Sequence, residues 1–101
     1  MTSIGEVAGA ATAVTAVAHL QALGDSLQAR GLHARVGETS GGIPQLIVVS
    51  TAVPTLSEVV FAAQGEGTWW FWWPWAERIA PVHELPTAVA RVCGVLTPPR
   101  A

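Results

Sequence analysis

The sequence predicts a small α+β domain with the element order α-β-β-β-β-α, in which two helices cover one face of a four-stranded antiparallel sheet. Apolar residues at helical spacing near both ends of the chain predict the helices, and apolar runs separated by turn-forming segments predict the strands between them. A chain of 101 residues suits one domain. We therefore expect a single domain over residues 1–101, with residues 1–9 and 97–101 flexible.

Both helices are predicted from a one-sided apolar stripe. The first runs from about Ala10 to Arg30 and ends at Gly31, a residue type suited to the left-handed position after a helix. Its stripe consists of Ala13, Ala16, Val17, Leu20, Leu23 and Leu27. The second runs from about Glu84 to Leu96, with Pro86 in its first turn. Its stripe consists of Leu85, Ala88, Val89, Val92 and Leu96.

Four strands are predicted between the helices. Residues 32–36 alternate between apolar and polar, as in a half-exposed strand, whereas residues 46–49 are continuously apolar and read as a strand buried on both faces. Residues 57–63 form the third strand and residues 69–73 the fourth. Trp75 to Ile79 is expected to form a short helical turn.

The fourth strand is the most unusual part of the chain. The run Trp69-Trp70-Phe71-Trp72-Trp73-Pro74-Trp75 holds all 5 tryptophans, and only one other aromatic residue, Phe61, occurs apart from histidine. Each aromatic side chain buries roughly 150–250 Å². Both faces of this strand therefore need cover, and the two helices supply it for one face.

The expected hairpin register assigns the two faces. Glycine at the first central position of Gln64-Gly65-Glu66-Gly67 predicts a type II′ turn centred on Gly65 and Glu66, which pairs Phe61 with Trp70. The face expected to pack under the helices then holds Val59, Phe61, Trp70 and Trp72. The face expected to stay uncovered holds Val60, Ala62, Trp69, Phe71 and Trp73. A slip of one residue would exchange these faces.

An apolar centre with a charged rim is typical of a protein interface, and tryptophan and arginine are enriched at binding hot spots. The residues predicted to bind a partner are Trp69, Phe71, Trp73, Trp75, Glu58 and Arg35. Glu77, Arg78 and His33 are candidate polar contacts for a ligand held against the tryptophans. A salt bridge at the sheet edge is the alternative role for the adjacent Glu77 and Arg78.

Composition favours association. Hydrophobic residues make up 50% of the chain and charged residues 12%, about half the usual charged share. The net charge of −2 argues against a nucleic-acid partner. The apolar stretch of residues 7–18 follows Glu6, lacks a basic flank and is too short to span a bilayer. With one cysteine, Cys93, the chain suits a reducing compartment, so we expect a cytoplasmic protein without membrane contact.

No catalytic motif is present. His19, His33 and His83 lack metal-ligand spacing, so neither a metal nor a cofactor is predicted. His83 is expected to help cap the last helix. Cys93 lies among valines and is expected to be a buried, inert thiol. We therefore predict no catalytic residues.

The run Trp69 to Ile79, with the preceding Leu27-Gln28-Ala29-Arg30-Gly31-Leu32, resembles small uncharacterised actinobacterial proteins that share a leading helix, a short sheet and a W-W-F-W-W-x-W-A-E-R-I-like signature. The resemblance covers about Leu20 to Leu96. It implies a cytoplasmic protein of high-GC Gram-positive bacteria and no assigned activity. The element order is also similar, in topology alone, to type III secretion chaperone-like domains, which are dimeric binders of peptides or proteins.

The leading expectation is a non-enzymatic protein-binding module: a homodimer that engages another protein as an adaptor or chaperone-like regulator. Three alternatives stay open for the tryptophans. They form the core of a monomer, they line a surface for another protein alone, or they wall a pocket in a small-molecule-binding protein or an unusual enzyme.

Overall fold

The computed structural model describes the backbone of residues 4–97 and the side chains of residues 12–97. Its elements in chain order are α1 (Ile4–Ala29), β1 (His33–Glu38), β2 (Pro44–Val49), β3 (Ser57–Gly65), β4 (Thr68–Trp72), β5 (Arg78–Pro81) and α2 (Leu85–Leu96). Helix α1 begins at Ile4, earlier than the predicted start near Ala10. The flexibility expected for residues 1–3 and 98–101 lies outside the described residues.

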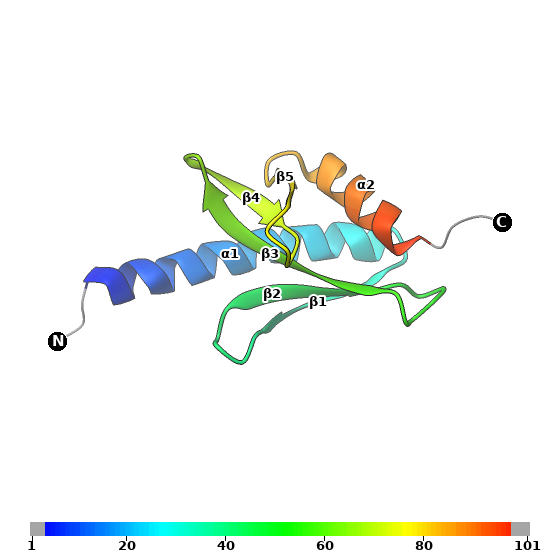
Figure 1. The fold of residues 1–101 in the computed structure, drawn as a ribbon, viewed down its shortest axis with the longest axis horizontal. Coiled ribbons are helices and arrows are strands. Elements are labelled where there is room, and N and C mark those ends of the chain that lie inside the picture. The colour runs from blue at the N-terminus through cyan, green and yellow to red at the C-terminus, as the bar shows by residue number, and fades with distance from the viewer. Residues whose placement is uncertain (1–3, 98–101) are drawn as a thin grey trace.

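The strands form one antiparallel sheet in the order β1-β2-β3-β4-β5 (Figure 1). The α+β class is confirmed, but the prediction of four strands is wrong because the segment expected to be helical ends in β5, which begins at Arg78. A tight turn produces this result. The Trp73 N–H donates to the Glu77 carbonyl at 2.8 Å, the Ala76 N–H donates to the Trp73 carbonyl at 3.0 Å, and Ala76 takes a φ of 65°. The chain therefore reverses and returns alongside β4.

Strand β3 belongs to both halves of the sheet. Its residues 57–60 pair with β2, and its residues 61–65 pair with β4. The ladder with β2 ends at the pair Leu46 and Val60. Its next hydrogen-bonded position falls on Pro44, which has no N–H to donate. Beyond this point the β1–β2 and β3–β4 hairpins diverge (Figure 1).

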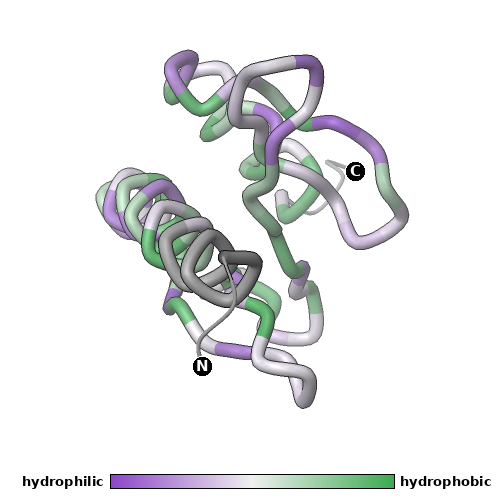
Figure 2. Tube along the Cα trace, turned by 90° about the vertical axis from the view of Figure 1, so that its left-hand side faces the viewer, coloured by the Kyte–Doolittle hydropathy of each residue, from purple (hydrophilic) through white to green (hydrophobic). Residues whose placement is uncertain are grey.

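Both helices pack into one core on the same side of the sheet. Helix α1 contacts β1, β2 and β3, and α2 contacts β5 and α1. Viewed along the long axis of the molecule, α1 lies to one side of the strands (Figure 2). Most of both predicted helix stripes is confirmed as core, with Leu20, Leu23 and Val92 at 0% exposure. Val17 is an exception at 38% exposure, and Ala13 and Leu85 are half-buried.

The β3–β4 turn differs from the predicted one. It is centred on Glu66 and Gly67, whose φ angles of 55° and 80° are those of a type I′ turn, so Gly65 pairs with Thr68. A Cβ atom on Gly65 would lie 3.1 Å from Trp72 Cζ2, which explains the glycine at this paired position. The turn shift changes the register by two residues, and Phe61 pairs with Trp72 rather than Trp70.

A register change of two residues keeps the predicted grouping of side chains, but the assignment of the two groups to the helices is reversed. Phe71 and Trp73 are only 1% and 6% exposed and lie in the core with Val60. Trp70 and Trp72 are half-buried on the face without helices. Helix α1 packs on the face of β1 and β2 that carries Leu46 and Val48 and buries these side chains. Because β3 pairs with β2 and then with β4, this packing also fixes which tryptophan side chains lie on the helix-covered face.

Replacing Phe71 with alanine should therefore lower the free energy of unfolding by about 3–5 kcal/mol, because a large core side chain is lost and a cavity remains. The matched control is Val95→Ala on α2, whose side chain is 48% exposed and should change stability by no more than about 0.5 kcal/mol. Urea denaturation followed by far-ultraviolet circular dichroism measures both. Equal costs for the two substitutions would contradict the observed face assignment.

Candidate functional site

The candidate site is the sheet face that points away from the helices, which we call the outer face. Cross-strand partners share a face, so the pairs Arg35–Ile47 and Ile47–Val59 place these three side chains in one row over β1, β2 and β3. The pairs of Trp72 with Phe61 and with Arg78 continue that face over β4 and β5. The outer face consists of His33, Arg35, Ile47, Val49, Val59, Phe61, Trp70, Trp72 and Arg78.

The centre of the outer face is apolar and its charges lie at the edges. Ile47, Val49, Val59 and Phe61 are all half-buried, although no helix described in the structure covers them. His33 and Arg35 are exposed at the β1 edge. Arg78 lies at the opposite, β5 edge. This distribution matches the apolar core and polar rim of a protein interface.

A bulge in β5 brings Arg78 onto the outer face. Phe71 pairs with Ala80 whereas Trp72 pairs with Arg78, so Ile79 is an extra residue between two ladder positions. Ile79 is fully buried. The bulge thus lets Ile79 fill the core while Arg78 reaches the tryptophans on the other side.

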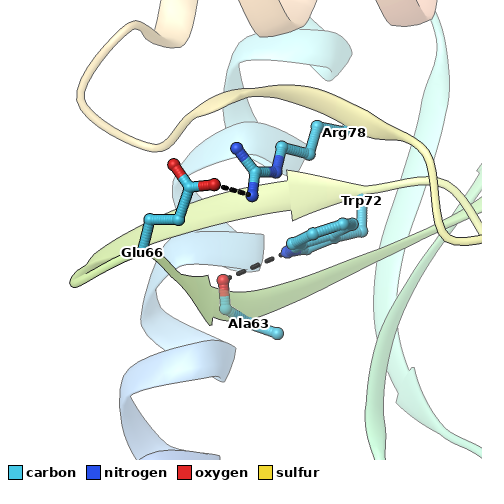
Figure 3. Close-up of polar contacts among 4 residues, drawn as sticks. All are labelled: Ala63, Glu66, Trp72 and Arg78. Carbon is cyan, nitrogen blue, oxygen red and sulfur yellow. Dashed lines mark hydrogen bonds and ion pairs between the residues drawn. The ribbon is translucent and has the colours of Figure 1, made fainter.

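Arg78 holds together a cluster at this edge. Its guanidinium carbon lies 4.7 Å from the Trp70 ring centroid and 5.4 Å from that of Trp72, within range of cation–π attraction. Arg78 Nη2 also donates to Glu66 Oε1 at 3.0 Å, and Trp72 Nε1 donates to the Ala63 carbonyl at 3.1 Å (Figure 3). These contacts fix both the cation and the Trp72 ring before any partner binds.

The cluster also affects protonation. The hydrogen bond from Arg78, followed by the attraction of its positive charge, lowers the pKa of Glu66 below its usual value of 4.5. The Trp70 indole N–H is buried and has no hydrogen-bond partner in the part of the chain that the structure describes. Such a donor costs stability, so the arrangement around Arg78 is not optimised for stability alone.

The predicted partner-binding residues are divided between different places. Phe71 and Trp73 are in the core, and Trp69 lies under α1 with its ring centroid 5.3 Å from that of His19. Glu58 is half-buried on the inner face, as its pairing with Val48 requires. Only Arg35, among the six predicted residues, lies on the outer face.

Trp75 occupies a separate exposed position in the turn before β5. It is 56% exposed, stacks on Trp73 with ring centroids 5.2 Å apart, and donates its indole N–H to Glu77 Oε2 at 2.9 Å. Of the candidate polar contacts, Glu77 is therefore engaged by Trp75. His33 and Arg78 reach opposite edges of the outer face, so the structure does not bring these three residues together.

The sequence interpretation missed Ile47 and Val49 as outer-face residues and placed Val59, Phe61, Trp70 and Trp72 under the helices. The sequence signal for this apolar outer face is the continuous apolar run of β2. Leu46 and Val48 point into the core, and Ile47 and Val49 then make the other face apolar too. A strand apolar on both sides in a sheet with helices on one side marks an uncovered apolar face.

The remaining candidate residues form no reactive group. Within residues 12–97, no set of three or more histidine, cysteine, aspartate or glutamate side chains could hold a metal ion. His83 lies 3.9 Å from Glu84, and α2 has no side-chain cap, so the predicted capping role is wrong. Cys93 is half-buried rather than fully buried. Neither helix of the described chain is both long and apolar enough to cross a membrane.

Comparison of the chain with models of protein families, with curated proteins and with solved structures found no match.

The Arg78–Glu66 contact predicts a specific pH dependence. Because the folded state lowers the pKa of Glu66, the pair stabilises the fold above the ordinary pKa, and this contribution is lost as the pH falls through the lowered value. The stability advantage of the native chain over Glu66→Gln should therefore shrink between about pH 6 and pH 3. Urea denaturation across this range measures the difference.

Glu38→Gln is the matched control, since Glu38 is exposed and forms no ion pair within the described residues. Its stability difference from the native chain should stay nearly constant over the same pH range. If the stability advantage of the native chain over Glu66→Gln does not change with pH, the Arg78–Glu66 pair does not stabilise the fold in the way predicted.

Proposed function

We propose that this protein is a non-enzymatic protein-binding module of the cytoplasm that forms a homodimer through its outer face and serves as an adaptor or chaperone-like regulator. The observation that carries the proposal is the continuous apolar surface from Ile47 through Val59 and Phe61 to Trp72, which lies opposite both helices. Apolar surface of this extent on a small protein is typical of an interaction site.

The size of the outer face suits a second copy of the chain. Five strands spaced about 4.8 Å apart span roughly 20 Å, and strands of about six residues are roughly 20 Å long. The projected area is then about 400 Å². Protruding side chains raise the accessible area towards the ~800 Å² that each partner buries in a standard interface.

The charges at the rim also suit a symmetric partner. Arg35 is exposed at one edge and has no ion pair among the described residues, whereas the Glu66 carboxylate at the other edge uses one oxygen for Arg78. A two-fold axis roughly parallel to the strands places the β1 edge of one protomer over the β5 edge of its partner. Each interface then contains this juxtaposition of a β1 edge with a β5 edge twice.

The alternative of a small-molecule pocket has less support. A hollow beside the β1 edge has a volume of about 190 Å³ and is lined by residues that include His33, Arg35 and Ile47. Ligand pockets usually measure about 300–1,000 Å³. A second hollow, between α1 and the β1–β2 hairpin, has a volume of about 310 Å³, but the tryptophans line neither hollow. Trp70 and Trp72 instead contact the Arg78 side chain.

Light scattering coupled to size-exclusion chromatography tests the homodimer directly. We expect a particle of two 10.5 kDa chains at micromolar concentration. Ile47→Ser combined with Phe61→Ser should give a folded monomer, because both side chains are half-buried on the outer face and neither belongs to the buried core cluster.

The matched control is Val95→Ser combined with Trp75→Ser, which removes two exposed apolar side chains away from the outer face. This control should remain a dimer. A native chain that elutes as a monomer would refute the proposal, and so would a control that dissociates as readily as the outer-face variant.

A further inference from the structure

The sheet contains an internal open edge where β2 leaves β3. In an antiparallel ladder, the N–H and C=O groups of one residue point to the same side, and the sides alternate along the strand. The Leu56 carbonyl accepts from the Ser50 N–H on the β2 side, and the ladder continues to Val60. Ala62 and Gln64 therefore turn their backbone N–H and C=O groups to this same side, where the described chain provides no ladder partner.

An apolar hollow lies beside the part of β2 that has left β3. It has a volume of about 310 Å³ and lies between α1 and the tip of the β1–β2 hairpin, with Val14, Val17, Glu38 and Pro44 among its lining residues. Pro44 is the residue that would face Ala62 if the ladder with β2 continued. The hollow thus lies between α1 and the β1–β2 hairpin, the hairpin that diverges from β3 and β4 beyond Leu46 (Figure 1).

The surroundings of the hollow are unusually apolar for a surface. Val14 is 71% exposed, Val17 is 38% exposed, and Ile43 in the hairpin tip, next to Pro44, is 58% exposed. These are three of the five large hydrophobic side chains found exposed in the described part of the chain. An open strand edge beside exposed apolar side chains is a template for pairing with another strand.

The wall of the hollow also carries an uncompensated charge. Glu38 lines it and is exposed, and the structure gives it no ion pair within residues 12–97. A bound segment with lysine or arginine at this position would supply the missing partner. The backbone groups, the apolar wall and the charge together define the chemistry of a ligand.

We propose that this groove, formed by the β3 edge at Ala62 and Gln64 and by the walls at Val14, Val17, Glu38 and Pro44, binds an extended segment of a partner protein by strand addition. The segment carries apolar side chains on alternate residues, directed at α1, and a basic residue near Glu38. Unpaired N–H and C=O groups at alternate positions require a strand rather than a helix. The groove shares no residue with the outer face, so the proposal goes beyond homodimer formation.

A second copy fits this groove less well than a foreign segment. Two-fold pairing of one β3 edge with another would offer only Ala62 and Gln64 to each hollow, and these side chains are too small or too polar to fill it. It would also leave Glu38 without a basic partner. Charge and side-chain volume therefore both favour a partner of different sequence.

Selection from a phage-displayed library of random decapeptides, with the full chain as bait, tests the proposal. Enriched peptides should alternate apolar and polar residues and carry lysine or arginine. Fluorescence anisotropy of one labelled peptide should show a Kd at least about tenfold weaker for Val17→Asp. Val14→Asp, at a more exposed position, repeats the test if Val17→Asp does not fold. Val95→Asp on α2 is the control and should bind unchanged.

Two further measurements separate strand addition from nonspecific apolar contact. Methylation of alternate backbone nitrogens on the pairing edge of the peptide should abolish binding, because the N–H donors to β3 are removed. Glu38→Arg should weaken binding of the basic peptide and strengthen binding of the same peptide with glutamate in place of its basic residue. The Ile47→Ser, Phe61→Ser variant should bind with unchanged Kd, which separates this site from the homodimer.

Failure to enrich any peptide over a Val17→Asp bait would overturn the proposal. Equal affinity of the enriched peptides for the native chain and the Val17→Asp and Val14→Asp variants would do the same. Binding that survives backbone methylation would refute the strand geometry.

Discussion

The pairing of β3 with two different neighbours is the constraint on which the rest of the structure depends. Its first half fixes Val60 beside Leu46 under α1, and its second half fixes Phe61 beside Trp72 on the opposite face. Because side chains alternate strictly along a strand, burying Val60 decides the direction of every aromatic residue in β4. The same division leaves β3 without a partner beyond Val60 on the β2 side, so one feature produces both the uncovered tryptophans and the open edge.

The tryptophan run of β4, together with the residue after it, therefore has two structural roles. Phe71 and Trp73 fill the domain core, where α1, α2 and β5 meet. Trp70 and Trp72 form the outer face with Arg78, whose stacked and ion-paired side chain already has a fixed position. A preformed aromatic and cationic surface loses little conformational entropy on association. This is the physical basis for proposing a binding module rather than an enzyme.

Much of the fold was predictable from the sequence, because helix stripes and apolar runs are local signals. The grouping of Trp70 with Trp72, and of Phe71 with Trp73, followed from strand alternation alone. Their assignment to the helix side did not, because it depends on how α1 crosses β1 and β2, which no local pattern encodes. Strand β5 was missed because only its pairing with β4, after the tight turn at Ala76, makes the short segment a strand. The open edge at Ala62 likewise arises because the β2–β3 ladder ends at Val60. This end point depends on how the strands assemble and is not visible in the local sequence.

The two-faced tryptophan strand is tested most directly by fluorine NMR of the chain labelled with 5-fluorotryptophan, in the presence of a soluble paramagnetic agent. Single Trp→Phe variants assign the signals. We expect the signal of Trp75 to broaden strongly and that of Trp73 to resist at every protein concentration. The signals of Trp70 and Trp72 should be protected in the dimer and broaden on dilution. Ready broadening of Trp73, with Trp70 and Trp72 protected at all dilutions, would contradict the account.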